Sequence, residues 1–425
     1  MGSTQKLVVM GQGYVGLPLA LRANASGFAV TGYDPARVTV DALNSGRSHI
    51  DDVTDAEVER ALAEGYRASS DATDLADADV VVVCVPTPLS ESGGPDLGAV
   101  ESAARTIGEH VSPGTLVVLE STTYPGTTEE VFAPLVLGRG LGLDDVLIAF
   151  SPERIDPGNP TYGVKNTPKV VGGLTPQATA AAKAFYGSFI DTVVEAKGAK
   201  EAEMAKLLEN TFRHVNIALV NEMVRFSDDL GIDLWDSIAC AETKPFGYMA
   251  FRPGPGVGGH CIPVDPSYLS HRVRAQLGYS FRMVELAEEI NNAAPLYVAD
   301  RLARSLNKRS MPVNGSTVLL VGVTYKTNIA DQRESPAVPL AKRLADMGAV
   351  VRYHDPFVPR WSVETKNGRL ELTSEDSVLA AAAQSDAVVL LQNHAEYDLE
   401  QLAEHSTLLL DTRGVVRVQA GVERL

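Results

Sequence analysis

The sequence predicts an α/β protein with two doubly wound, Rossmann-like domains that are joined by a central helical domain with one long helix. Short apolar runs rich in β-branched residues alternate with helix-like stretches, which is the pattern of a parallel sheet with crossover helices. This pattern occurs near both ends of the chain, and a long helical stretch separates the two occurrences. The 425 residues also exceed what one compact core usually holds, so two or three domains are expected.

The first sheet is predicted from five apolar runs. Each run leads into Gly, Pro, Ser or Thr residues, as strands that feed ligand-binding loops do. We expect this N-terminal domain to span residues 1–196. The runs are Lys6–Met10, Ala29–Tyr33, Asp79–Val85, Thr115–Glu120 and Val146–Phe150.

The central region, residues 197–305, is predicted to be helical. From about Lys200 to Leu230 apolar residues recur every three or four positions without Gly or Pro, which indicates one helix of ~30 residues and about 45 Å. A second helical stretch covers Tyr279–Leu306, and the Gly- and Pro-rich loop Arg252–Pro266 lies between them. One large α/β domain with insertions is the alternative to this division.

The C-terminal region, residues 306–425, repeats the opening theme. VVMGQGYVG near the start is echoed by LLVGVTYKT, and DADVVVVCVP is echoed by SDAVVLLQNH. We therefore expect a second doubly wound domain with the same topology but without a phosphate-binding fingerprint. Its predicted strands are Ser316–Val323, Val350–Tyr353, Asp386–Leu391 and Thr407–Asp411.

Composition excludes several classes of protein. A formal charge of −17 argues against a non-specific hold on nucleic acid or on an anionic membrane. No run approaches the ~20 apolar residues of a membrane span, and the start of the chain does not resemble a signal peptide. The three cysteines, Cys84, Cys240 and Cys261, are too scattered for a disulfide framework or a zinc site. We expect a cytoplasmic protein with reduced thiols and no metal.

A glycine-rich turn predicts a dinucleotide site after the first strand. The sequence from Gly11 to Gly16 has the form G-x-G-x-x-G, and Asp34 ends the next predicted strand 18 residues beyond Gly16. The pyrophosphate would face the N-terminus of the following helix, and Asp34 would bind the ribose hydroxyls and repel a 2′-phosphate. NAD is therefore favoured over NADP, although Arg37 would soften that preference. The cofactor-binding residues expected here are Gly11, Gly13, Tyr14, Val15, Gly16, Asp34 and Arg37.

Two later loops also fit the cofactor. Thr87 follows the third of the predicted strands, and Ser121 and Thr122 follow the fourth. Ligands bind outside the carboxyl ends of such strands. Thr87 and Ser121 would serve equally well as N-caps of the helices that follow, so both interpretations stay open here.

Reactive residues are concentrated in the central region. Lys206 and Asn210 are four positions apart on the long predicted helix, so they share one face and would stabilise an oxyanion together; a solvated helix face is the alternative. Cys261 follows Gly258 and Gly259, which would leave its thiol accessible to a ligand, and Asp265 is placed to activate water. A small buried hydrophobic residue is the alternative for Cys261.

Seven sequence blocks, in this order across almost the whole chain, resemble the UDP-glucose/GDP-mannose dehydrogenase family of NAD-dependent nucleotide-sugar 6-dehydrogenases. The spelling GGHCIPVDP is most similar to the branch that acts on UDP-N-acetylhexosamines, because the UDP-glucose branch usually has a lysine where this chain has Val264. The blocks are GQGYVGLPLA, VPTP, STTYPGTT, SPER, EAEMAKLLENTF, GPGVGGHCIPVDP and GVTYKTNIADQRES.

The resemblance implies a four-electron oxidation of the C6 alcohol of a nucleotide-linked hexose, with two NAD as hydride acceptors. Cys261 would capture the intermediate aldehyde as a thiohemiacetal, and the second oxidation would give a thioester that water hydrolyses to the uronate. Lys206 and Asn210 would stabilise the oxyanions, Asp265 and Thr122 would hold water, and Glu153 would be the general base.

The resemblance also implies the binding residues and the oligomeric state. The cofactor would contact Arg333, and the central helix would form a homodimer. The arginine that UDP-glucose enzymes donate across the dimer interface is missing, and Lys244 is at best a partial substitute. The expected substrate-binding residues are Glu153, Arg154, Lys206, Asn210, Arg252, Gly258, Tyr325, Lys326 and Arg413.

Two other functions are compatible with parts of the sequence. A two-electron β-hydroxyacid-type dehydrogenase would share the dinucleotide site, the helical domain and the Lys206–Asn210 pair, but it would not need Cys261. A non-catalytic protein that binds NAD or a nucleotide sugar would need none of the reactive residues. Among nucleotide sugars, the base and the hexose both stay open.

Overall fold

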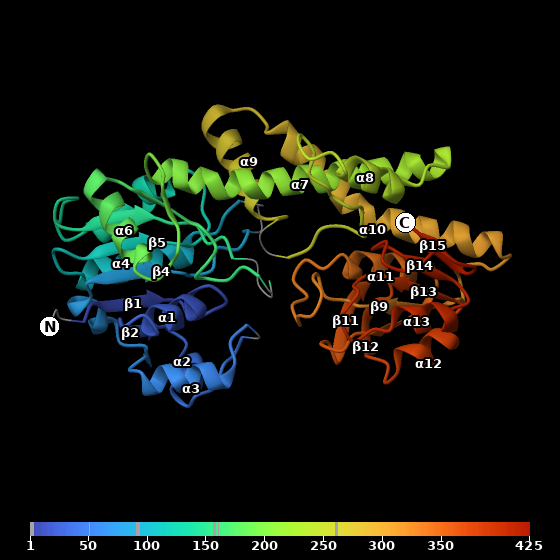
Figure 1. The fold of residues 1–425 in the computed structure, drawn as a ribbon, viewed down its shortest axis with the longest axis horizontal. Helices are drawn as coiled ribbons and strands as arrows, with labels where there is room; N and C mark the ends of the chain where they lie inside the picture. Colours follow the sequence, from blue (N-terminus) through green and yellow to red (C-terminus); the bar gives the residue numbers. More distant parts are fainter. Residues whose placement is uncertain (1–3, 51, 91–93, 156–158, 160, 260–261) are drawn as a thin grey trace. The chain divides into compact units, whose positions relative to one another are not determined.

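The described residues form two large sheets that are each associated with helices, and a two-stranded hairpin accompanies the second of them (Figure 1). The computed structural model describes residues 4–50, 52–90, 94–155, 159, 161–259 and 262–425. Contacts divide the chain into two compact units. The N-terminal unit comprises Met1–Glu209 with Ser267–Tyr279, and the C-terminal unit comprises Asn210–Pro266 with Ser280–Leu425. The division into three domains at 196/197 and 305/306 stays a prediction.

The described residues of the N-terminal unit form an eight-stranded sheet in the order β3-β2-β1-β4-β5-β6-β7-β8. Neighbouring strands run parallel except β6 and β7. All five predicted runs form strands; β3, β7 and β8 are additional. The strands are β1 Lys6–Met10, β2 Ala29–Tyr33, β3 Arg67–Ser69, β4 Val80–Val83, β5 Leu116–Leu119, β6 Leu147–Phe150, β7 Lys169–Gly173 and β8 Val193–Glu195.

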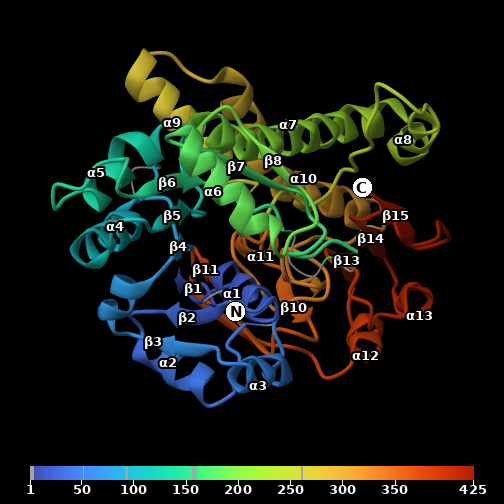
Figure 2. The ribbon, with the colours of Figure 1, turned by 60° about the vertical axis from the view of Figure 1, so that its left-hand side comes forward.

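Helices pack on both faces of this sheet. Side chains alternate across a strand, so Leu7 and Val9 of β1 join one apolar core while Val8 and Met10 join another. Helix α6 packs against β7 and β8 (Figure 2). The helical segments are α1 Gly16–Asn24, α2 Arg37–Asn44, α3 Asp55–Ala63, the 3-10 turn η1 Ala72–Asp77, α4 Gly98–His110, the π-helical turn η2 Thr128–Phe132, α5 Ala133–Val136 and α6 Pro176–Gly187.

The predicted long helix is confirmed as α7, Ala199–Leu230, with 32 residues. The boundary between the two units falls within it, after Glu209. The other helices of the central region are α8 Leu234–Glu242, α9 Asp265–Leu277 and α10 Arg282–Lys308. No helix among the described residues has both the length and the apolar character needed to cross a bilayer.

The described residues of the C-terminal unit form a five-stranded parallel sheet in the order β10-β9-β13-β14-β15. The segment β10-β9-β13-β14 repeats the order β2-β1-β4-β5 of the first sheet, so the predicted second doubly wound sheet is confirmed. Its elements are β9 Thr317–Val321, α11 Ala337–Asp346, β10 Val350–His354, the hairpin β11 Arg360–Thr365 and β12 Gly368–Thr373, α12 Val378–Ala383, β13 Ala387–Leu390, α13 Leu399–His405, β14 Leu409–Asp411 and β15 Val422–Arg424.

A chain of buried polar side chains joins α7, α10 and the Gly- and Pro-rich loop. Asn221 of α7 accepts the backbone N–H of Gly254 at 2.9 Å and donates to the side-chain oxygen of Asn291 at 3.0 Å. The Asn291 amide lies 3.4 Å from Nδ1 of His214 and 3.2 Å from the His214 carbonyl oxygen. Burial lowers the pKa of His214 to about 4, so this imidazole is neutral in the folded protein at neutral pH.

His214 should make the stability of the protein depend on pH. Its pKa falls from 6.5 in the unfolded chain to about 4 in the folded protein, so the unfolded state takes up the proton first as the pH falls. This one group should lower the free energy of unfolding by roughly 2 kcal/mol between pH 7 and pH 5. Urea unfolding of His214→Asn, which keeps an acceptor toward Asn291, should show a smaller loss. His405→Asn, at an exposed histidine, is the control; equal pH dependence in all three proteins would contradict the assignment.

Candidate active site

The glycine turn after β1 has the geometry of a dinucleotide site. Gly11 has φ +88°, and a Cβ there would lie 2.6 Å from the carbonyl oxygen of Cys84. A Cβ on Gly16 would lie 1.8 Å from the Gly11 carbonyl oxygen, so helix and turn approach each other as only glycine permits. A Cβ on Gly13, in contrast, would meet nothing within 4 Å. Open space beside the backbone at the start of α1 fits a diphosphate.

Asp34 holds this turn from the end of β2. One carboxylate oxygen accepts the backbone N–H of Gln12 at 3.1 Å, and the other accepts that of Ala36 at 2.9 Å. The side chain is half-buried and remains accessible to a ribose. Tyr14, which is 39% exposed, flanks the turn, Val15 is half-buried, and Arg37 is exposed at the start of α2. The residues therefore fit the adenosine half of NAD.

The loops that follow β4 and β5 are tied to each other. Ser121, in the loop after β5, donates its hydroxyl to the Val85 carbonyl oxygen, in the loop after β4, at 2.7 Å. The loop after β4 is also bound to α9, because the carbonyl oxygen of the buried Thr87 accepts a hydrogen bond from the Tyr268 hydroxyl. The helical segments that follow have Leu97 and Thr127 at their N-cap positions, and neither side chain makes a capping hydrogen bond. The alternative interpretation of Thr87 and Ser121 as N-caps is therefore wrong.

Glu203 of α7 organises the turn after Ser121. Its buried carboxylate accepts the backbone N–H of Gly126 at 2.6 Å, and it accepts the backbone N–H and the hydroxyl of Thr128 at 2.9 and 2.6 Å. Burial raises the pKa of Glu203, and these hydrogen bonds oppose the rise. One helical turn along, Lys206 donates to the hydroxyl of Thr122. The anchored turn thus places Thr122 against Lys206.

Lys206 and Asn210 are buried, with 8% and 9% of their surface exposed, so the alternative of a solvated helix face is wrong. Asn210 donates its amide to the Asp265 carboxylate at 2.6 Å, and Asp265 is 1% exposed at the first residue of α9. Cys261 lies outside the described residues.

The glycines before Cys261 pack against the C-terminal sheet's first loop. A Cβ on Gly258 would lie 2.7 Å from Cβ of Tyr325, and a Cβ on Gly259, which has φ +84°, would lie 2.7 Å from the Tyr325 ring. The Gly259 N–H also donates to the Arg333 carbonyl oxygen at 3.0 Å. The role of Gly258 that the structure supports is close packing under Tyr325, and its contact with substrate stays a prediction.

A buried pair, Asp355 and His394, fixes the loop that carries Tyr325 and Lys326. The Asn328 N–H donates to Nδ1 of His394 at 2.8 Å, so the imidazole proton resides on Nε2, which lies 3.1 Å from the Asp355 carboxylate. Burial alone would raise the pKa of Asp355, but the hydrogen bond from His394 and the backbone donors lower it. Asp355 directly follows β10 as Asp34 directly follows β2, and it likewise accepts a backbone N–H of the turn after the first strand of its sheet, that of Val323, at 2.7 Å.

Four of the predicted substrate- and cofactor-binding arginines fall into two groups. Arg154, Arg252 and Arg333 form ion pairs with Glu209, Glu242 and Asp331, respectively, at 2.7, 2.7 and 2.6 Å. Arg413 instead donates Nε to the Leu391 carbonyl oxygen at 2.5 Å, and its guanidinium lies beside Gly254 of the Gly- and Pro-rich loop. Burial lowers the pKa of Arg413 to about 10, so it is still charged at neutral pH.

Sequence reasoning missed a buried ionic cluster beside Glu153. Lys169 lies 2.9 Å from the Glu120 carboxylate and 3.4 Å from that of Glu153, and the Tyr186 hydroxyl donates to Glu120. No local pattern could have revealed it, because Lys169 begins a strand that was not predicted.

The matching family models describe this chain as an NAD-dependent dehydrogenase. An NAD binding domain matches residues 5–190, a central domain matches residues 200–293, and a UDP binding domain matches residues 319–418. The first match contains the glycine turn and Asp34. The chain belongs to the UDP-glucose/GDP-mannose dehydrogenase family.

Individual relatives cover nearly the whole chain. An NDP-N-acetyl-D-galactosaminuronic acid dehydrogenase from Ralstonia nicotianae is 35% identical over 96% of this chain and 95% of that protein. A UDP-N-acetyl-D-glucosamine 6-dehydrogenase from Pseudomonas aeruginosa is 35% identical over 92% of this chain and 91% of that protein. The structure of a UDP-D-ManNAc dehydrogenase from Pyrococcus horikoshii is similar with a TM-score of 0.88, at 31% identity and 99% coverage of both chains.

These matches confirm the resemblance that the motifs indicated, including its N-acetylhexosamine branch. The chain is an NAD-dependent nucleotide-sugar dehydrogenase. The β-hydroxyacid-type and non-catalytic alternatives are thereby set aside.

Asp34 should determine the preference for NAD over NADP. Asp34→Asn removes the charge that would repel a 2′-phosphate and weakens charge-assisted hydrogen bonds to the ribose, so kcat/KM for NAD should fall roughly 10- to 100-fold. The ratio of NADP to NAD activity should rise. Steady-state kinetics with both cofactors check this, with Asp41→Asn on the exposed face of α2 as the control. An unchanged ratio would contradict the role of Asp34.

Proposed function

We propose that this enzyme oxidises the C6 alcohol of a UDP-N-acetylhexosamine to the uronate in two successive hydride transfers, through a thioester on Cys261. One observation carries the proposal. Four of the six predicted catalytic residues form two hydrogen-bonded pairs. In each pair a residue of α7 contacts a residue from another segment, Lys206 with Thr122 and Asn210 with Asp265. The names of the relatives support the choice of sugar.

The first oxidation needs a proton acceptor and a cation. NAD, when bound, accepts the hydride that leaves C6 in each oxidation. The C6 hydroxyl transfers its proton to a water held by Asp265 and Thr122, while Lys206 and Asn210 stabilise the developing oxyanion. The resemblance implies that Cys261 reacts as a thiolate, and a cation such as Lys206 would favour that form if it lay close to the thiol.

The second oxidation and hydrolysis proceed through the cysteine. The thiolate of Cys261 forms a C–S bond to the aldehyde carbon, whose carbonyl electron pair moves to oxygen. Loss of the second hydride restores the carbonyl as a thioester. Glu153 then takes a proton from water as the water adds to this carbonyl, and the C–S bond breaks to release the uronate and the thiolate.

We assign the three predicted domains to three tasks. Residues 1–196 bind NAD, residues 197–305 supply Lys206, Asn210 and the Cys261 loop, and residues 306–425 bind the nucleotide. Arg413 and Lys326 are the groups of the C-terminal domain that would contact the diphosphate, and Tyr325 would pack near the base. The position of Arg413 beside Gly254 supports this assignment.

We also propose that the enzyme is a homodimer through α7. Exposed apolar side chains repeat along one face of this helix at spacings of four and seven residues, which is the pattern of a helix that packs on another helix. Between 46% and 69% of each side chain is exposed, at Leu208, Phe212, Leu219, Phe226 and Leu230. A second copy of the chain would cover this apolar face.

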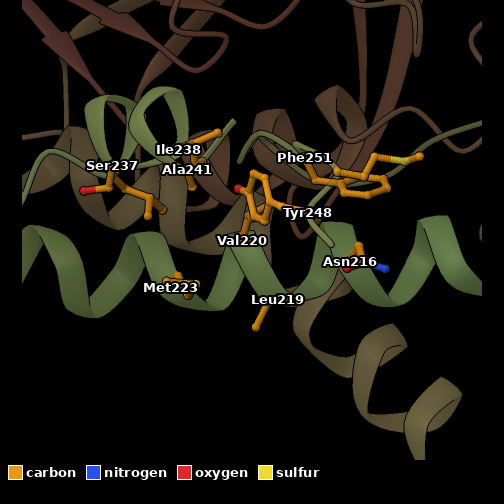
Figure 3. A pocket seen from close by; sticks show the side chains of 11 residues that line it. Asn216, Leu219, Val220, Met223, Ser237, Ile238, Ala241, Tyr248 and Phe251 are labelled. Carbon is orange, nitrogen blue, oxygen red and sulfur yellow. The ribbon is translucent and has the colours of Figure 1, made fainter. Parts of the chain in front are cut away.

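Further apolar residues extend this surface. A hollow between α7, α8 and residues 248–251 borders the face at Leu219 (Figure 3). Tyr248 and Met249, at its rim, are 41% and 63% exposed, and Lys244 lies over the ring of the exposed Phe246. Exposed apolar side chains that cluster in this way on the surface of a single chain are typical of a protein–protein interface.

The number of NADH molecules formed per sugar tests the proposed function. With UDP-N-acetylglucosamine, and across a panel of UDP-, dTDP- and GDP-hexoses, the preferred substrate should yield two NADH per sugar at completion. Cys261→Ser should yield no uronate, because the second oxidation requires the thiolate. Cys240→Ser, at an exposed cysteine, should retain two NADH per sugar. One NADH per sugar from the natural enzyme would exclude the thioester mechanism.

Leu219→Lys should dissociate the proposed dimer. A lysine in the centre of an apolar interface loses its hydration without gaining a partner, so the protein should sediment as a monomer at micromolar concentration. Sedimentation velocity measures this directly. Glu404→Lys, on the exposed surface of α13, introduces the same side chain as a control and should leave a dimer. A Leu219→Lys protein that sediments as the natural protein does would contradict the interface.

A further inference from the structure

A buried ionic cluster lies at the carboxyl edge of the N-terminal sheet. Glu120 follows β5, Glu153 lies in the loop after β6, Lys169 begins β7, and Tyr186 belongs to α6. The Lys169 ammonium lies 2.9 Å from Glu120 and 3.4 Å from Glu153. Tyr186 donates its hydroxyl to the other oxygen of Glu120. Three adjacent strands and a helix therefore meet at one ammonium group.

The reversed direction of β7 creates this arrangement. The antiparallel ladder pairs Phe150 with Gly172, and the same register brings Glu153 opposite Lys169. A parallel strand would have placed its first residue at the opposite edge of the sheet, away from the ligand loops. The geometry thus brings a lysine to the edge where the loops after β4, β5 and β6 converge.

The members of the cluster differ in their access to solvent. The side chains of Glu120 and Lys169 are 0% and 7% exposed, whereas that of Glu153 is 11% exposed. Both oxygens of Glu120 are occupied, one by Lys169 and one by Tyr186. Glu153 has one oxygen near Lys169 and accepts the N–H of Ile155 at its other oxygen at 2.5 Å. Glu153 is therefore the carboxylate of the cluster that water reaches most easily.

The charges of the cluster are mutually dependent. Burial alone would lower the pKa of Lys169, but the two carboxylates outweigh burial and raise it, so the ammonium stays charged. Burial raises the pKa of Glu120, and Lys169 and the Tyr186 hydrogen bond oppose that rise. Loss of the ammonium would leave two carboxylates close together in a poorly solvated place, which is costly.

We propose that Lys169 is a positioning residue for Glu153, and that Glu120 and Tyr186 fix Lys169 in turn. Lys169 holds the Glu153 carboxylate in place for its reaction with water, whereas Glu120 and Tyr186 hold the ammonium against β5 and α6. The inference rests on the role of Glu153 as the general base in the proposed function. It predicts a defect in thioester hydrolysis, which follows both hydride transfers.

The decisive variant changes two residues. Lys169→Met with Glu120→Gln removes one positive and one negative charge together, so that the cluster keeps a single carboxylate, Glu153. Mixed rapidly with UDP-N-acetylglucosamine and NAD, this enzyme should release a burst of up to two NADH per active site, followed by turnover roughly 10- to 100-fold slower than that of the natural enzyme. Mass spectrometry of the intact protein should show the acyl group on the enzyme.

Three further variants separate positioning from folding. Lys169→Arg keeps the cation and should restore turnover to within a few-fold. Tyr186→Phe deletes one hydroxyl with little risk to the fold, and it should give a smaller burst; this variant decides the question if the double variant does not fold. Lys183→Met, in the exposed ion pair with Glu195, is the matched control and should behave as the natural enzyme does.

Glu153→Gln distinguishes failure of this inference from failure of the proposed function. If Glu153→Gln gives the burst but the double variant and Tyr186→Phe turn over without one, the cluster only stabilises the sheet and the positioning role is overturned. If Glu153→Gln itself gives no burst, Glu153 is not the base, and the proposed hydrolysis step fails together with the inference.

Discussion

Buried carboxylates hold the loops that follow the strands, and the geometry of the candidate site depends on them. Asp355 and Asp411, at the ends of β10 and β14, each accept several backbone N–H groups. Glu203 does the same for the turn after β5, and Glu120 is paired with Lys169. Burial of a carboxylate without its hydrogen-bond or ionic partners costs free energy, so each of these carboxylates favours the one loop conformation in which its partners are in place. The rigidity that catalysis needs thus comes from electrostatics as well as from apolar packing.

The two sheets show how one topology supports two kinds of site. Asp34 and Asp355 occupy equivalent positions, and each accepts a backbone N–H of the turn after the first strand of its sheet. Asp34 remains half-buried and accessible to a ribose, whereas Asp355 is fully buried against His394. In the C-terminal sheet the carboxylate therefore organises the protein's own loop, the one that carries Tyr325 and Lys326. Function follows from the side chains around the strand ends and not from the topology.

The features that could be predicted from the sequence are those defined by a short spacing between residues or by a periodic apolar pattern. The glycine turn, Asp34 and the Lys206–Asn210 pair are each defined by spacing within one turn or one helix, and strands such as β1 are continuous apolar runs. The strand β7 begins with Lys169 and ends in two glycines, and β3 has only three residues, so neither has a clear pattern. The pairing of Glu153 with Lys169 depends on the direction and register of β7, which no local pattern contains.

A protein of net charge −17 must bind the anionic diphosphate of its nucleotide-sugar substrate, so the positive charge that binds it must be local. Arg252 is more than half exposed and already paired with Glu242, so an anion that binds it must replace an existing partner. Arg413 is already partly desolvated and donates to a backbone carbonyl. An anion that contacts Arg413 strips less water from the cation, and it competes with a neutral acceptor for that donor. In the proposed binding mode the diphosphate therefore gains more from Arg413 than from the exposed Arg252, and the acidic remainder of the chain disfavours anions elsewhere.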